Sequence, residues 1–220
     1  MSKRSLKEMT QGMSFAEKLE YLWEYYRWIL LVLAFGVIVI AMVVTGIVNT
    51  SGEVFYSGAM VNVQLSQEGE SFLTERLEEN FNAPKREKAK LFATSFQDLQ
   101  NVSDVEMSAA AAYRVVLMII AKDYDYVIMD ETAWNYYKNH PVFTALDEMF
   151  SDEIMEQYSD RIIRHQLEES AQLSLAIDIT DSAFARKYAQ EGTKLYIAFP
   201  GNTGRTEMND DFLEYLMNAE

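Results

Sequence analysis

The sequence predicts one transmembrane helix followed by an α/β domain with a mainly parallel sheet. Two observations support this fold class. No charged residue occurs between Arg27 and Glu53, and residues 28–48 are apolar over about the length that crosses a bilayer. Beyond this run, patterns typical of strands alternate with patterns typical of helices as far as residue 217, which favours parallel strands joined by helices.

The apolar run 28–48 has no polar face. A soluble amphipathic helix would repeat polar residues with a 3.6-residue period, whereas here only Gly36, Thr45 and Gly46 interrupt the run of Leu, Val, Ile, Ala, Met and Phe. Lipid admits only helices or closed barrels, because every backbone donor needs a partner inside the protein. We therefore expect a membrane-spanning helix at 28–48 and a short linker at 49–53.

An aromatic cluster with one arginine precedes this run. Tyr and Trp settle at the lipid headgroups with their polar tips in water, and arginine reaches the phosphates, so these residues are expected to anchor the helix at the membrane interface. A ligand-stacking platform is the less favoured interpretation. The predicted anchor consists of Tyr21, Trp23, Tyr25, Tyr26, Arg27 and Trp28.

The distribution of basic residues predicts the orientation. Five Lys or Arg residues precede the run, and the next one is Arg76. The positive-inside rule therefore places residues 1–27 in the cytoplasm and the domain at 54–220 outside the cell, as a single-pass protein of the cell membrane. A cleaved signal peptide is the alternative, but the apolar run is longer than is usual for one and no small-residue cleavage site follows.

Residues 1–27 are predicted to contain a juxtamembrane helix. Ser14 and Glu17 fit a capping box, in which each side chain covers an orphan amide at the helix start. Apolar side chains at 15, 19, 22, 23 and 26 then fall on one face. Such a helix is expected to lie on the inner leaflet, with docking to a partner helix as the sharper alternative.

Composition limits the partners of the outer domain. The formal net charge is −15, and residues 1–27 contribute +1, so the remainder carries −16. An acidic surface repels nucleic acid and anionic lipid, which excludes nucleic acid as a partner. The chain contains no cysteine, so disulfides and thiolate chemistry are also excluded.

The domain is predicted from its periodicities and helix-start signals. Strands are expected at 54–65, 87–96, 124–130, 172–180 and 193–200, and helices at 70–81, 131–139, 183–190 and 207–217. Residues 142–170 are expected to be largely helical. A capping box at 103–106 opens a further helix that is apolar on most sides, so we expect it to be enclosed in the core.

Four segments carry a resemblance to a known class. They are the opening strand after the anchor, AKDYDYVIMDETAWNYY, AIDITDSAFARKY and LYIAFPGNTGRTEMNDDFLEYL. Together they resemble the small membrane-anchored proteins of Gram-positive bacteria whose outer domains have the periplasmic-binding type II (extracellular solute-binding) fold. The resemblance implies a reduced version of that fold, because the chain is shorter than a two-lobed binder, and it implies binding of a small solute or of a membrane protein such as a transporter or sensor.

Motifs of catalysis are missing from the sequence. There is no phosphate-binding loop and no nucleophile elbow, and the two histidines, His140 and His165, lack a zinc-ligand spacing, so no cofactor or metal is expected. Carboxylate pairs such as Asp123 with Asp125 leave an acidic hydrolase as the alternative function. Asp130, Asp181 with Ser182, and the pair Asp210–Asp211 are expected to cap helices.

A ligand site, if present, is expected where strands end. In open α/β sheets ligands bind beyond the carboxyl ends of the strands. Hydroxyl, amide and carboxylate groups at those ends suit recognition by hydrogen bonds rather than covalent catalysis. The predicted ligand-binding residues are Thr94, Ser95, Asp130, Glu131, Thr180, Asp181, Ser182 and Asn202. We expect protein interaction rather than solute capture, with five tyrosines as a second candidate partner surface: Tyr124, Tyr126, Tyr136, Tyr137 and Tyr158.

Overall fold

The computed structural model describes residues 53–95, 105–166 and 172–219, and isolated residues between 14 and 42. Residues 53–220 form one compact unit and residues 1–52 another. In the first unit the described residues 31–32, 35–38 and 41–42 are helical. In the described part of the chain no helix is both long and apolar enough to cross a membrane. Most of the predicted helix at 28–48 lies outside the described residues.

The interface anchor is likewise covered only in part. Trp23 and Arg27 are described, are helical and are exposed to solvent. The other four predicted anchor residues, Tyr21, Tyr25, Tyr26 and Trp28, lie outside the described residues, as do most of the predicted juxtamembrane helix and the linker at 49–52. The membrane anchor therefore stays a prediction from sequence.

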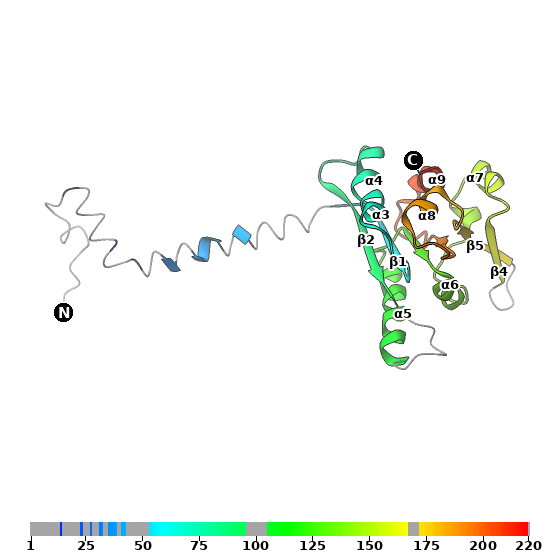
Figure 1. Cartoon of the computed structure of the whole chain (residues 1–220), viewed down its shortest axis with the longest axis horizontal. Coiled ribbons are helices and arrows are strands. Elements are labelled where there is room, and N and C mark those ends of the chain that lie inside the picture. Colours follow the sequence, from blue (N-terminus) through cyan, green and yellow to red (C-terminus); the bar gives the residue numbers. More distant parts are fainter. Residues whose placement is uncertain are drawn as a thin grey trace. The chain divides into compact units, whose positions relative to one another are not determined.

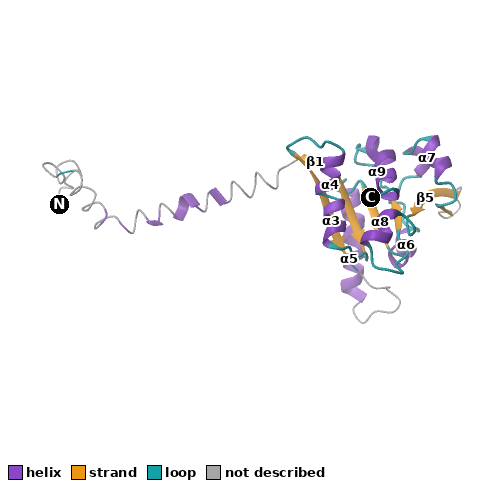
Figure 2. Cartoon of the chain, turned by 45° about the horizontal axis from the view of Figure 1, so that its top comes forward, coloured by secondary structure: helices purple, strands orange, loops and turns teal. Residues whose placement is uncertain are grey.

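The second unit is an α/β domain built on one six-stranded sheet (Figures 1 and 2). Its strands are β1 (Glu53–Val61), β2 (Glu87–Thr94), β3 (Tyr126–Met129), β4 (Ile162–Gln166), β5 (Gln172–Asp178) and β6 (Tyr196–Ala198). Its helices are α3 (Gln67–Phe72), α4 (Glu75–Asn80), α5 (Val105–Ile120), α6 (Glu131–Tyr137), α7 (Asp152–Gln157), α8 (Ala183–Tyr188) and α9 (Asn209–Met217). Short 3-10 turns at Leu146–Glu148 and Thr206–Met208 complete the described elements.

The sheet is mixed, so the prediction of a mainly parallel sheet is wrong. The strand order is β2-β1-β3-β6-β5-β4; β1 pairs in parallel with β2 and β3, and the other three pairings are antiparallel. Strand β6 is antiparallel to β5 because the chain enters β6 at the same edge of the sheet at which β5 ends. Leu195, just before β6, accepts a hydrogen bond from the amide of Ile179, just after β5, at 2.9 Å. A strand that starts where its neighbour ends must run in the opposite direction.

Two helix predictions also need correction. The helix expected at 70–81 is divided into α3 and α4 by Leu73 and Thr74, and the Thr74 backbone (φ −126°, ψ −90°) is not helical. The region 142–170, expected to be largely helical, contains α7 and the edge strand β4. The apolar part of β4 is only Ile162 and Ile163, and so short a run does not distinguish a strand from a helix.

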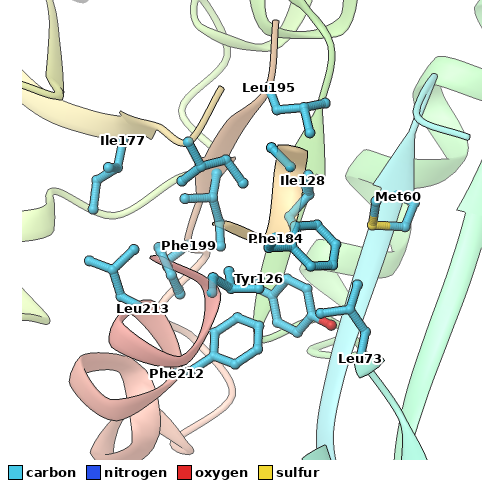
Figure 3. Close-up of a cluster of buried hydrophobic side chains, with 14 of the residues drawn as sticks. Met60, Leu73, Tyr126, Ile128, Ile177, Phe184, Leu195, Phe199, Phe212 and Leu213 are labelled. Carbon is cyan, nitrogen blue, oxygen red and sulfur yellow. The ribbon is translucent and has the colours of Figure 1, made fainter. Parts of the chain in front are cut away.

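Apolar clusters fill both faces of the sheet, because successive strand residues point to opposite sides. In β3, Tyr126 and Ile128 face α3, α4, α8 and α9, whereas Val127 and Met129 face α5 and α6. Figure 3 shows part of the first cluster, in which the Phe212 ring of α9 lies beside Tyr126. Their ring centroids are 4.4 Å apart. The domain is thus three layers, with helices on each side of the sheet.

Gly58 in β1 makes room for one of these aromatic rings. A Cβ atom at this position would lie 2.0 Å from Cζ of Tyr126. That distance is far inside van der Waals contact, so any side chain here would displace the ring. The ring can therefore pack flat against β1 only because residue 58 is glycine.

Candidate functional site

The predicted site residues gather mainly at one edge of the sheet. Val61 pairs with Thr94 and with Met129, so the ends of β1, β2 and β3 lie side by side. Since β6 runs antiparallel to both β3 and β5, the end of β5 points to the same edge. This edge therefore collects Asn62, Thr94, Asp130 and Thr180, as the topological argument predicted for the last three.

Asp130 is the centre of this edge. It is the N-cap of α6, where its Oδ1 accepts a hydrogen bond from the amide of Ala133 at 2.8 Å. The same oxygen accepts from Nδ2 of Asn62 at 3.2 Å. Asn62 has φ of 60°, and its backbone N–H donates a hydrogen bond to the carbonyl of Thr94 at 2.9 Å. The predicted capping role of Asp130 is confirmed, and the cap and the Asn62 contact both use one oxygen of its carboxylate.

Glu131 forms an ion pair at the outer side of the same edge. Its Oε1 lies 2.8 Å from Nζ of Lys194, and both side chains are more than half exposed. Exposed pairs of this kind contribute little to stability, about 0–1 kcal/mol. The pair places a cation and an anion in solvent and gives no enclosed site.

Two of the next three predicted residues, Thr180 and Ser182, hold the chain around the end of β5. Oγ1 of Thr180 accepts a hydrogen bond from the amide of Leu195 at 3.0 Å. Ser182 is the N-cap of α8, accepts from the amide of Ala185 at 3.0 Å and is buried. Asp181 is exposed and makes no cap, so its predicted capping role is wrong, whereas that of Ser182 is confirmed.

Two surface pockets at this edge are each lined by two of the predicted residues. One, of about 360 Å³, is lined by Thr94 and Ser95 together with Asn62 and its neighbours. Another, of about 560 Å³, is lined by Thr180 and Asp181 with residues of α8 and the following turn. Asp130, Glu131 and Ser182 line neither. The predicted residues therefore share an edge but do not enclose one common cavity.

Asn202 lies at the opposite edge, so its placement in the predicted site is wrong. The prediction treated the end of β6 as if it were the end of a parallel strand. Because β6 is antiparallel, the residues after it lie near the start of β3, and Nδ2 of Asn202 donates to the carbonyl of Ile119 at 2.8 Å. Its Oδ1 is buried without a hydrogen-bond partner among the described residues.

That opposite edge contains a buried ion pair that sequence reasoning missed. Nε of Arg205 lies 3.0 Å from both carboxylate oxygens of Asp125, whose side chain is 1% exposed against 31% for Arg205. The amide of Ser57 donates to the same carboxylate at 2.7 Å, and the hydroxyl of Thr203 donates to it as well. Asp125 directly precedes a fully buried strand, which was the one available signal; its partners Ser57, Thr203 and Arg205 lie 68, 78 and 80 residues away.

The contacts of the buried Asp125 carboxylate indicate a structural role. Burial raises its pKa, while the hydrogen bonds from Thr203 and Arg205 lower it. Its acceptor sites face donors from β1 and from the segment 203–205, so it fastens that segment to the sheet. The carboxylate predicted to pair with it, Asp123, is exposed to solvent. This arrangement does not provide the two carboxylates facing one cavity that a hydrolase needs.

The expectation of exposed tyrosines is wrong for four of the five. Tyr124, Tyr126, Tyr137 and Tyr158 are buried, and Tyr136 is half-buried. Their apolar rings are used in the two clusters that flank the sheet, with Tyr137 also donating its hydroxyl to the carbonyl of Ala112 at 2.8 Å. They do not form a partner surface.

The exposed apolar surface lies on α5 instead. This helix buries Ala112, Val115 and Ile119 against the sheet, but Tyr113, Leu117 and Ile120 are 58%, 48% and 65% exposed. The expectation that the core encloses α5 is therefore wrong. One face of α5 packs against the sheet, and the large apolar side chains on its other face are exposed to solvent. We call Ala110, Tyr113, Leu117 and Ile120 the α5 stripe.

The comparisons with known proteins add no identification. No family model, curated protein or solved structure matches this chain.

Proposed function

We propose that this chain is a non-catalytic, single-pass protein of the cell membrane whose outer α/β domain binds a partner protein through the α5 stripe. The observation that carries the proposal is the exposure of three large apolar side chains on one face of α5. Soluble proteins seldom leave such side chains in a contiguous patch unless the patch binds something. The membrane location rests on the apolar run 28–48 and on the asymmetry of basic residues around it.

Protein binding is favoured over solute capture by the shape of the domain. The resemblance to type II solute-binding proteins implies a ligand between two lobes, but residues 53–220 form one compact unit around one sheet. The hydrogen-bonding groups of Asp130, Thr180 and Ser182 at the predicted ligand edge are used by helix caps and turns. The predicted residues that do line a pocket are divided between two separate pockets. Within the described residues, no cluster of His, Asp or Glu is arranged to hold a metal ion.

A photo-crosslinker on α5 tests the binding proposal. Because the native chain has no cysteine, Ala110→Cys in the full chain gives one attachment point at the first residue of the stripe, and Glu156→Cys on α7 gives an exposed control. After irradiation in native membranes we expect a discrete protein adduct from Ala110→Cys only, which adding Leu117→Asn abolishes and which re-forms with the purified partner. Equal adducts from both sites, or none from Ala110→Cys, would contradict the proposal.

The membrane topology has its own test. In intact cells a membrane-impermeant maleimide should label Glu156→Cys and leave Ser5→Cys unlabelled until the membrane is permeabilised. Labelling of both positions, or of Ser5→Cys alone, would reverse or remove the predicted orientation.

A further inference from the structure

We infer that the partner of the α5 stripe is a second copy of this chain, and that the two α5 helices pair in antiparallel fashion. This inference rests on the proposed function and names the partner for the same surface. It is carried by the order of side-chain sizes along the stripe and by the charges at its two ends.

The stripe forms a continuous seam along the helix. Its four residues are spaced by three, four and three positions, which places them on one face within an arc of about 80° at 3.6 residues per turn. Arg114 lies outside this arc, so the seam from Ala110 to Ile120 contains no charged side chain. It extends about 15 Å along the axis at 1.5 Å per residue.

An antiparallel register pairs the seam with itself in layers that are more even in size than those of a parallel pair. When the two-fold axis crosses the helices at the level of residue 115, Ala110 faces Ile120 of the second copy, and Tyr113 faces Leu117. Each layer then joins a smaller side chain to a larger one. A parallel pair would put Tyr113 against Tyr113 and Ala110 against Ala110, which crowds one layer and leaves a gap in another.

The charges at the ends of α5 favour the same direction. Glu106 lies in the first turn of α5, and Lys122 follows its last turn. In the antiparallel register Glu106 lies at the level of residue 124 of the second copy, beside the exposed Lys122 and Asp123, whose charges offset each other, whereas a parallel pair brings Glu106 next to Glu106. The whole chains, at −15 each, repel one another. Pairing should therefore strengthen as salt screens that repulsion, the opposite of what a basic partner would show.

A single pair of helices is a small interface, below the roughly 1,200 Å² typical of stable complexes. In dilute solution we therefore expect weak association. Attachment of both copies to one membrane raises their effective concentration, because encounter becomes confined to the bilayer plane. The test accordingly uses the full chain reconstituted in lipid vesicles.

Cysteine crosslinking distinguishes the registers. A disulfide needs Cα atoms about 4.4–6.8 Å apart, so residues 110 and 120 of one helix, about 15 Å apart, cannot bridge within a chain. The double variant Ala110→Cys/Ile120→Cys should give a covalent dimer under mild oxidation. Each single variant should give at least about tenfold less, and the yield of the double variant should rise with salt. Efficient dimers from both single variants, or no dimer from any, would overturn the inference.

The crosslinker at Ala110 separates this inference from the proposed function. An adduct with the mass of two chains supports both. An adduct with a different protein, together with no disulfide dimer, overturns self-pairing and leaves the proposed function standing. No adduct of either kind overturns both.

Discussion

The helices α9 and α5 cover opposite faces of the same sheet, and they use their apolar residues differently. In α9 the large apolar side chains Phe212, Leu213 and Leu216 are all fully buried. In α5 the residues that touch the sheet are mainly small or β-branched, and larger ones point to solvent. The comparison indicates that the apolar residues of α9 form part of the core of this domain, whereas the exposed side chains of the α5 stripe do not contribute to that core.

The largest expected effect on stability comes from shortening one large apolar side chain on each of the two helices. Phe212→Ala removes a ring that packs 4.9 Å from Tyr56 and 4.4 Å from Tyr126, and should lower the free energy of unfolding by about 3–5 kcal/mol. Leu117→Ala on α5 should cost less than about 1 kcal/mol, because half of that side chain is already in water. Urea denaturation measures both changes in the free energy of unfolding, provided that wild type and variants show the same dependence on urea concentration. A cost for Leu117→Ala equal to that for Phe212→Ala would mean that the stripe belongs to the core.

Local patterns account for what the sequence predicted of these elements. Strands β1, β2, β3 and β5 each contain a short apolar run, and α6 and α8 directly follow Asp130 and Ser182, whose side chains cap them as expected. The closing helix was also found, since its apolar residues repeat at helical spacing. These signals lie within one element, so a single sequence contains them.

The direction of β6 and the exposure of α5 depend on distant parts of the chain. Which edge Leu195 returns to depends on its contact with Ile179, and that contact decides that Asn202 leaves the predicted site. The apolar residues of α5 look the same in sequence whether or not another layer covers them. Likewise, Asp125 is one acid among many until the fold brings Arg205 beside it.

The next largest effect should come from breaking the Asp125–Arg205 pair. Arg205→Met leaves a buried carboxylate with no cation, which should cost about 3 kcal/mol at pH 7. Arg186→Met on α8, which is exposed, is the matched control and should change stability by less than about 0.5 kcal/mol.

The cost of Arg205→Met should depend on pH with a definite sign. Burial already raises the pKa of Asp125 above the value of about 3.9 for an unfolded chain, and loss of Arg205 raises it further. Between about pH 4 and the folded pKa, the folded protein binds a proton that the unfolded chain has released, so stability falls as pH rises. The variant should therefore approach the wild type near pH 4 and diverge towards pH 7. A cost that is constant from pH 4 to 7 would show that the Asp125 charge is not involved.

Two stacked tyrosines under α9 should respond with opposite signs. The hydroxyl of Tyr56 donates to Oδ1 of Asn209 at 2.7 Å, whereas that of Tyr126 is buried without a partner among the described residues. Tyr56→Phe should lower the free energy of unfolding by about 1–2 kcal/mol, because it orphans a buried acceptor. Tyr126→Phe should leave it unchanged or raise it by up to about 1 kcal/mol. Thermal unfolding of both variants gives the comparison, and equal losses would mean that Tyr126 has a bonding partner.

The smallest effect on stability should accompany the largest effect on association. Leu117→Asn places an amide where the side chain is about half in water, so the free energy of unfolding should change by less than about 1 kcal/mol. The same change puts a polar group opposite Tyr113 of the second copy, and it should reduce the disulfide yield of Ala110→Cys/Ile120→Cys at least about tenfold, or 1.4 kcal/mol. Lys187→Asn on α8 is the surface control and should alter neither quantity. Loss of stability together with loss of crosslinking would assign Leu117 to the fold. Loss of crosslinking alone assigns it to a contact between chains, because the domain then keeps its stability without that side chain while the two copies no longer pair.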